Sequence, residues 1–328
     1  MTLEQIENSE IPKPKAKGKI AYVFPGQGSQ SVGMGKDFAN NFSIARAVFE
    51  EADDILGFKL SELCFAGNAE ELQLTENTQP AILTVSVAAF RVMKSEGFPL
   101  PSYVAGHSLG EYSALVAAGA INFADAVRIV RLRGRFMQEA VPVGIGSMAA
   151  ILGLDLQTVE TACAEASQGK VCSAANMNSQ TQTVIAGHAE AVERASELLK
   201  ERGAKRAIKL NVSAPFHSVL MQQAQDRLSV ELTKMRFFDL MTPCVSNVEA
   251  RPYDEAEKAR ELLIRQVTSP VRWMQSVEYL KENGVTTFVE IGAGKVLGGL
   301  IRQTFREANC LNVEDGESLQ ATKTALEI

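Results

Sequence analysis

The first 120 residues alternate between short apolar runs and longer segments with helical periodicity. The apolar runs at 20–24 and 103–105 each end in a loop rich in Pro or Gly, which is typical of buried strands. Apolar residues recur at helical spacing over 42–56, 70–74, 79–95 and 111–120. Strands that alternate with helices in this way predict an α/β fold with a mostly parallel sheet.

The pattern changes between residues 144 and 208. Strand patterns at 146–154, 171–177, 182–186 and 206–212 are interleaved with helical patterns at 156–167 and 190–202. The order β-α-β-β-α-β is typical of a ferredoxin-like unit. We therefore predict a ferredoxin-like α+β subdomain at 144–208, inserted into a larger α/β domain that spans 19–143 and 209–309.

The remainder of the larger domain returns to the first pattern, and both ends of the chain are polar. Helical patterns cover 222–234, 256–266 and 296–307, and extended patterns cover 242–247 and 285–291. The polar residues 1–18 predict a flexible leader, and the polar residues 310–328 predict a loosely held tail.

Composition narrows the class of protein. The 328 residues are 46% hydrophobic and 22% charged, as in a globular protein with a sizeable core. No window approaches the roughly 18 consecutive apolar residues of a membrane helix, and the polar start is unlike a secretory signal. A net charge of −6 argues against partners such as nucleic acid or an anionic membrane. Five cysteines without a CxxC pair and three scattered histidines argue against a metal site and favour reduced thiols in the cytoplasm.

Residues 106–110 match the pattern G-x-S-x-G between a predicted strand and a predicted helix. The flanking glycines permit a sharp turn that exposes the Ser108 hydroxyl at the carboxyl edge of the sheet. The start of the following helix adds positive potential and free N–H groups. We therefore predict that Ser108 is a nucleophile rather than a structural turn serine.

A serine nucleophile needs a base, and the chain offers three histidines. His217 follows the end of a predicted strand, from which its side chain can reach the edge of the site. His107 adjoins the serine on a strained turn, which favours an orienting or structural role. His188 stands at a predicted helix start, which favours a helix cap or an exposed position. We predict that His217 is the base.

Arg133 lies at the centre of an apolar arc of about 120° on the helical wheel of residues 126–137. A guanidinium buried on such a face needs an anionic partner. Two interpretations fit this pattern equally well. One is a structural ion pair with an Asp or Glu, and the other is a fork that binds a substrate carboxylate through two hydrogen bonds.

Two other loops with glycines follow predicted strands. The loop 26–30 lacks the Lys-Ser/Thr ending of a P-loop, and its backbone N–H groups suit an oxyanion hole instead. The loop that starts at Gly292-Ala-Gly294 does not match the dinucleotide fingerprint G-x-G-x-x-G, because the next glycine is Gly298. The sequence therefore predicts no nucleotide cofactor.

Several short motifs occur in a set order along the chain. They are Pro25-Gly-Gln-Gly-Ser-Gln30, Asn77-Thr-Gln-Pro80, Gly106-His-Ser-Leu-Gly-Glu111, Arg133-Gly-Arg-Phe-Met-Gln138, Ala175-Asn176 with Gly187, Pro215-Phe-His217 and Pro270-Val-Arg-Trp273. This set and its order resemble those of the malonyl-CoA:acyl carrier protein transacylases. The likeness covers residues 19–306, which is nearly all of the chain.

The resemblance implies a Ser-His dyad. Ser108 would be the acylated nucleophile and His217 its base. In this family a backbone carbonyl orients the histidine in place of an acidic side chain, and the matching position here is Gln266. The backbone N–H groups of Gln27 and Leu109 would form the oxyanion hole.

The resemblance also implies a malonyl pocket. Arg133 would pair with the free carboxylate of the malonyl group, which favours the second of the two interpretations given above. Gln79 would help to line the acyl pocket. Phe216 resembles the bulky residue of malonyl-selective members, where it leaves little room for a 2-methyl branch.

The fold implied by the resemblance is a larger hydrolase-like α/β domain with a ferredoxin-like insert and an active site in the cleft between them. The implied activity is the transfer of malonyl from malonyl-CoA to the phosphopantetheine thiol of holo acyl carrier protein, which supplies fatty acid synthesis. It needs no metal and no cofactor, and we expect a cytoplasmic monomer. Three alternatives stay open: an acyltransferase that loads a polyketide synthase, an acyl-thioester hydrolase with the same dyad, and a carrier-protein-binding scaffold with a decayed site.

Overall fold

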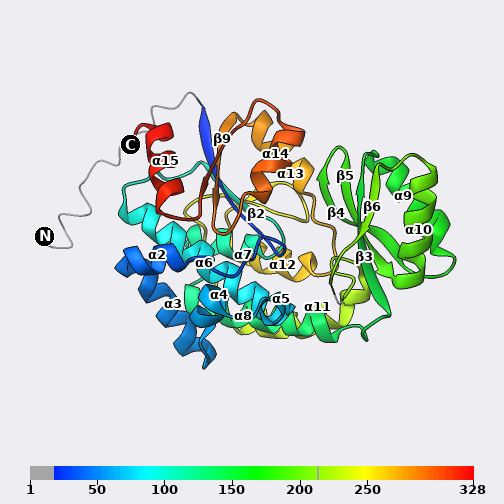
Figure 1. Ribbon diagram of the computed structural model, residues 1–328, viewed down its shortest axis with the longest axis horizontal. Coiled ribbons are helices and arrows are strands. Elements are labelled where there is room, and N and C mark those ends of the chain that lie inside the picture. Colours follow the sequence, from blue (N-terminus) through cyan, green and yellow to red (C-terminus); the bar gives the residue numbers. More distant parts are fainter. Residues whose placement is uncertain (1–17, 213) are drawn as a thin grey trace, which may run out of the picture.

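The computed structural model describes residues 18–212 and 214–328 (Figure 1). The predicted leader, apart from Gly18, lies outside these residues. The larger body lies on one side of the molecule in Figure 1, and a smaller unit, which contains β3 to β6 with α9 and α10, lies on the other. The predicted fold class, α/β with an α+β insert, is confirmed.

The larger body is built on a six-stranded sheet. Its order is β10 (Asn309–Val313), β9 (Val285–Ile291), β1 (Lys19–Phe24), β2 (Tyr103–Gly106), β7 (Cys244–Val245) and β8 (Pro252–Tyr253). All neighbouring pairs are parallel except β7 with β8. Parallel strands are covered on both faces, which accounts for the continuous apolar run that predicted β1.

Helices cover both faces of this sheet. The first half contributes α2 (Lys36–Asn41), α3 (Ser43–Leu56), α4 (Leu60–Ala66), α5 (Ala69–Gln73), α6 (Thr75–Ser95), α7 (Gly110–Ala117) and α8 (Phe123–Glu139). The second half contributes the 3₁₀ turn η1 (Val219–Met221), α11 (Gln222–Lys234), α12 (Ala256–Gln266), α13 (Trp273–Glu282), α14 (Val296–Thr304) and α15 (Gly316–Leu326).

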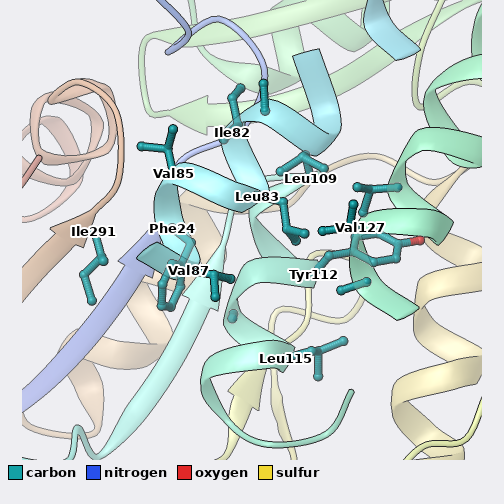
Figure 2. Close-up of a cluster of buried hydrophobic side chains, with 14 of the residues drawn as sticks. Phe24, Ile82, Leu83, Val85, Val87, Leu109, Tyr112, Leu115, Val127 and Ile291 are labelled. Carbon is teal, nitrogen blue, oxygen red and sulfur yellow. The ribbon is translucent and has the colours of Figure 1, made fainter. Parts of the chain in front are cut away.

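Alternate residues of β1 point to opposite faces of the sheet. Ile20, Tyr22 and Phe24 belong to the larger core cluster, together with buried residues of α3, α6, α7 and α8. Ala21 and Val23 belong to a second cluster with buried residues of α13 and α14. Figure 2 shows the first cluster where side chains of α6 and α7 meet the sheet. These two apolar layers hold the carboxyl ends of β1 and β2 in place.

Helix α6 begins four residues before its predicted start. The helical pattern predicted a start at residue 79, whereas the helix runs from Thr75 to Ser95 with Pro80 inside it. The N–H groups of Asn77 and Thr78 each donate to the Leu74 carbonyl at 2.8 Å and complete the extra turn. Pro80 lacks the N–H that would bond to the carbonyl four residues earlier, but the helix continues past it to Ser95.

The smaller unit has the topology that the pattern predicted. It contains β3 (Gly146–Leu152), α9 (Leu156–Ser167), β4 (Cys172–Ser179), β5 (Gln182–His188), α10 (Ala189–Glu201) and β6 (Arg206–Lys209). The sheet is antiparallel in the order β4-β5-β3-β6, which is the ferredoxin-like arrangement. Its last strand ends at Lys209 rather than at 212, because Leu210 and Val212 line cavities next to Ser108 instead.

The smaller unit is joined to the larger body through strand β4. The Met177 N–H donates to the Val271 carbonyl, and the Val271 N–H donates to the Ala175 carbonyl, each at 2.8 Å. The Ser179 hydroxyl donates to Gln303 Oε1 at 2.7 Å. One edge of the insert is therefore attached to the segment that precedes α13.

The prediction of a loosely held tail at 310–328 is wrong. Residues 309–313 form the edge strand β10, in parallel register with β9, and residues 316–326 form α15. Val313, Leu319 and Leu326 are buried in the larger core cluster. The segment looked polar because an edge strand and an amphipathic helix each bury only one side.

We expect Leu319→Ala to lower the free energy of unfolding by about 2–5 kcal/mol, because it removes a buried side chain that anchors α15. Urea unfolding followed by circular dichroism measures this. The exposed neighbour Gln320 provides the control, and Gln320→Ala should change the free energy by less than about 0.5 kcal/mol. Equal stabilities of the two variants would show that α15 is not part of the core.

Candidate active site

Ser108 occupies a tight turn between β2 and α7. Its φ of 51° is in the left-handed region that non-glycine residues rarely adopt. A Cβ at Gly106 would lie 1.9 Å from the Gly110 carbonyl carbon, and one at Gly110 would lie 2.0 Å from the Phe24 carbonyl oxygen. The turn therefore needs both glycines for close backbone contact. The Ser108 N–H donates to Asn247 Oδ1 at 2.6 Å, which fixes the turn from the neighbouring strand end.

His217 forms a dyad with this serine. Its Nε2 lies 2.7 Å from Ser108 Oγ, and its Nδ1 lies 2.9 Å from the Gln266 backbone carbonyl. A carbonyl only accepts, so Nδ1 carries the proton and Nε2 is free to accept the serine proton. Burial, and then the positive charge of Arg133, lower the pKa of His217 to about 3. The imidazole is therefore neutral and able to act as a base at neutral pH.

The other two histidines have different surroundings. His107 lies 2.8 Å through Nε2 from Asn178 Oδ1, and its ring packs against Trp273 with centroids 5.8 Å apart. The prediction that His188 caps a helix or is exposed is wrong. His188 is half-buried at the N-cap position of α10, makes no side-chain cap, and accepts the Val171 N–H at 3.0 Å through Nδ1. This bond attaches the start of β4 to the end of β5.

Arg133 is 1% exposed on the inner face of α8, and its hydrogen bonds all go to neutral groups. Its Nη1 donates to Gln79 Oε1 at 2.8 Å, and its Nη2 donates to Gln266 Oε1 at 2.8 Å and to Ser108 Oγ at 3.1 Å. Its Nε has no partner among the described residues. No carboxylate in the described part of the chain forms an ion pair with it. A buried guanidinium of this kind can bind a small anion beside the serine.

The dyad opens into a small cavity of about 100 Å³. Ser108, His217, Arg133, Gln79 and Gln27 contribute its polar lining. Its apolar lining comes from Leu109, Met137, Met148, Leu210, Val212 and Phe216. All the residues that the sequence assigned to the site thus meet here, except Gln266, which lies behind His217.

A larger cavity of about 430 Å³ adjoins the small one and leads away from it. The two share Gln27, His107, Asn176, Leu210 and Val212 in their linings. Residues of the loop after β1 form one wall, and residues of β4, β5 and the segment after β6 form another. The cleft therefore lies between the larger body and the insert, and it can admit a long, narrow substrate.

The backbone N–H groups of Gln27 and Leu109 donate to no acceptor among residues 18–212 and 214–328. Gln27 lies in the loop after β1, and Leu109 lies directly before α7. Both residues line the small cavity. The two N–H groups are thus available to an oxyanion that forms at the carbon attacked by Ser108.

The sequence analysis did not identify two buried residues that support the site, Asn247 and Glu111. Asn247, besides accepting the Ser108 N–H, donates through Nδ2 to the Gly106 carbonyl at 2.6 Å. Glu111 is fully buried and accepts hydrogen bonds from Gln266 Nε2 and the Tyr253 hydroxyl. Burial raises the pKa of Glu111 to about 7. The only sequence pattern that could have indicated Asn247 is its position soon after an extended segment, β7, at the carboxyl edge of the sheet.

In the described part of the chain, no group of three or more His, Cys, Asp or Glu side chains is placed to hold a metal ion. A search of the same residues found no helix with the length and apolarity needed to span a membrane.

The chain is similar to known acyltransferases over nearly its whole length. The acyl transferase domain family matches residues 21–322. The chain is 50% identical to the malonyl CoA-acyl carrier protein transacylase of Salmonella typhimurium, over 93% of this chain and 99% of that protein. It is also 50% identical to the protein of that name from Bacillus subtilis strain 168, over 92% of this chain and 95% of that protein.

Solved structures agree with this likeness. The malonyl CoA-acyl carrier protein transacylase of Coxiella burnetii matches with a TM-score of 0.92 and 43% identity, over 94% of this chain and 98% of that one. A malonyl-transacylase in complex with a type II polyketide synthase acyl-carrier protein matches with a TM-score of 0.91 and 48% identity, over 94% and 99%. With its Ser-His dyad, its buried arginine and these relatives, the chain belongs to the malonyl-CoA:acyl carrier protein transacylases of the acyl transferase family.

Proposed function

We propose that this chain transfers a malonyl group from malonyl-CoA to the phosphopantetheine thiol of acyl carrier protein, through a malonyl ester on Ser108. The observation that carries the proposal is the buried Arg133 guanidinium, which has no ion-pair partner among the described residues and lies 3.1 Å from Ser108 Oγ. A carboxylate on the acyl group is the partner that this cation lacks. Among short acyl thioesters, malonyl-CoA has such a carboxylate.

In the first half-reaction, His217 Nε2 takes the proton of Ser108 Oγ as the oxygen attacks the thioester carbonyl carbon. The resulting oxyanion accepts hydrogen bonds from the Gln27 and Leu109 N–H groups. The carbon–sulfur bond then breaks, and the proton passes from His217 to the sulfur of coenzyme A. In the second half-reaction, the carrier thiol gives its proton to His217 as its sulfur attacks the ester carbonyl carbon. The ester carbon–oxygen bond then breaks, and His217 returns the proton to Ser108 Oγ.

Arg133 selects the acyl group. A malonyl carboxylate in the small cavity takes hydrogen bonds from the guanidinium, while Gln79 and Gln266 continue to hold the group from behind. Phe216, Met137 and Met148 are buried or nearly buried apolar side chains around the same space. They restrict branches on the middle carbon of the acyl group, which favours malonyl over its 2-methyl analogue.

Fatty acid synthesis is the pathway that we propose for the product. The structural relative in complex with a type II polyketide synthase carrier favours a second pathway, polyketide synthesis, with the same reaction. A thioester hydrolase has no use for a carboxylate-binding arginine, and a decayed scaffold has no use for an intact dyad. We also propose a cytoplasmic monomer, and the five free cysteines support the reducing compartment.

Brief mixing of the chain with malonyl-CoA should add one malonyl group to the protein, because Ser108 forms an ester. Intact-protein mass spectrometry measures the adduct. It should be absent in Ser108→Ala and should pass to the carrier thiol when holo acyl carrier protein is added. Loss of the adduct at the same rate without carrier protein would identify a hydrolase. An adduct from another acyl-CoA, but none from malonyl-CoA, would mean that the chemistry is as proposed and that malonyl-CoA is not the substrate.

We expect Arg133→Ala to lower kcat/KM for malonyl-CoA by about 100-fold, because it removes the buried partner of the substrate carboxylate. Slow transfer from acetyl-CoA should change far less. The exposed Arg135, two residues along the same helix, is the control, and Arg135→Ala should leave both rates within about 2-fold of wild type. Equal losses for malonyl and acetyl in Arg133→Ala would contradict the assigned role.

The low pKa of His217, about 3, predicts how Ser108 reactivity depends on pH. Because the imidazole stays neutral above its pKa, labelling of Ser108 by an uncharged fluorophosphonate should change less than about 3-fold between pH 8 and pH 5. A histidine with the ordinary pKa of about 6.5 would lose about 30-fold over that range. The measurement is the rate of labelling, with Ser108→Ala as the blank and circular dichroism as the check of folding. A fall with a midpoint near pH 6.5 would refute the neutral buried base.

A further inference from the structure

Gln266 contacts the base and the buried cation through two different groups. Its backbone carbonyl accepts from His217 Nδ1 at 2.9 Å, and its side-chain Oε1 accepts from Arg133 Nη2 at 2.8 Å. The other end of the same amide, Nε2, donates to the Glu111 carboxylate at 2.7 Å and to the Ser108 carbonyl at 3.1 Å. The direction in which this amide points therefore decides whether Arg133 meets an acceptor or a donor.

Glu111 sets that direction. An ionised carboxylate only accepts hydrogen bonds, and a guanidinium only donates them. With Glu111 at one end of the amide and Arg133 at the other, one of the two amide orientations satisfies both groups. The reversed amide would place Nε2 against the guanidinium and Oε1 against the carboxylate, so that both contacts would be repulsive.

Glu111 is itself firmly held. It lies in the first turn of α7, three residues after Ser108, and is 0% exposed. Its Oε1 accepts from the Tyr253 hydroxyl at 3.0 Å, and its Oε2 also accepts from the Asn247 N–H at 3.2 Å. It forms no direct ion pair among the described residues, and the positive charge of Arg133 acts on its carboxylate at longer range, across the Gln266 amide. Because burying a carboxylate without a direct ion pair lowers stability, its presence here points to a role beyond packing.

We propose that Glu111 is a positioning residue for malonyl specificity, which orients the Gln266 amide and through it holds the Arg133 guanidinium ready for a substrate carboxylate. The inference rests on the proposed malonyl transfer. Glu111 touches neither the substrate nor the reacting atoms. Since His217 is held by the backbone of Gln266 and not by its side chain, the loss of Glu111 should weaken malonyl preference and spare the dyad.

Glu111→Gln tests this, because it keeps the size of the side chain and adds an N–H₂ group that permits the Gln266 amide to reverse. At about pH 8, where the Glu111 carboxyl is ionised, the preference for malonyl-CoA over acetyl-CoA should fall about 10-fold. Most of the fall should be a higher KM for malonyl-CoA. Labelling of Ser108 by the uncharged fluorophosphonate should keep its wild-type rate. An unchanged preference in this variant would overturn the inference.

Tyr253→Phe is the matched control. It removes one hydrogen bond from the same carboxylate but leaves the bond to Gln266 in place. We expect a lower Tm and a malonyl-to-acetyl preference within about 2-fold of wild type. A fall in preference as large as that of Glu111→Gln would show that any disturbance of the buried cluster has this effect, which would also overturn the inference.

A second variant, Gln266→Met, keeps the inference testable by itself if Glu111→Gln does not fold, and the two form a double-mutant cycle if it does fold. Gln266→Met removes the amide and keeps the backbone carbonyl, so it should lower the malonyl preference about 10-fold by itself. Glu111→Gln added to it should cause little further loss, because both act through one amide. Additive losses, or a wild-type preference in Gln266→Met, would overturn the inference. A wild-type enzyme without any malonyl preference would contradict the proposed function instead.

Discussion

The site depends on the burial of one guanidinium, that of Arg133, which forms no direct ion pair with a described carboxylate and interacts with Glu111 only across the Gln266 amide. A buried cation lowers stability unless its surroundings replace the water that it has lost. Here the side chains of Gln79 and Gln266 provide acceptors on one side, and the remaining side faces Ser108 and the small cavity. The positive charge also lowers the pKa of His217, so the group that we propose selects the substrate also helps to keep the proposed base neutral.

The parallel sheet brings the parts of the site to one edge. Ser108 follows β2, Gln27 follows β1 and Asn247 follows β7. The proposed nucleophile, a proposed oxyanion donor and the side chain that holds the turn therefore come from three neighbouring strands. The glycines of the turn allow these backbones to approach within the space that a Cβ would occupy. Function and fold therefore share the same constraint, which is close backbone packing at the ends of β1 and β2.

The insert completes the cleft. Met148 of β3, Asn176 of β4, and Leu210 and Val212 after β6 line the cavities beside the dyad. His217 comes soon after β6 in the sequence, so the proposed base and the residues that form one wall of the cleft are close together along the chain. Two separately packed cores thus meet at the cleft in which we propose that the thioester binds, with its acyl end in the small cavity.

The sequence by itself determined the elements, the α/β class and the ferredoxin-like insert, because these follow from local periodicity and turn residues. It also singled out Ser108 and the unusual place of Arg133. It did not predict β10 and α15, because each has a polar side as well as the apolar side that packs against β9 or the core, and the segment as a whole is therefore polar. Only the tertiary structure decided what lies around Arg133 and how Gln266 joins it to Glu111, a residue 155 positions away in the chain. Hydrogen bonds between such distant residues depend on which surfaces the fold brings together, and a local sequence pattern does not contain this information.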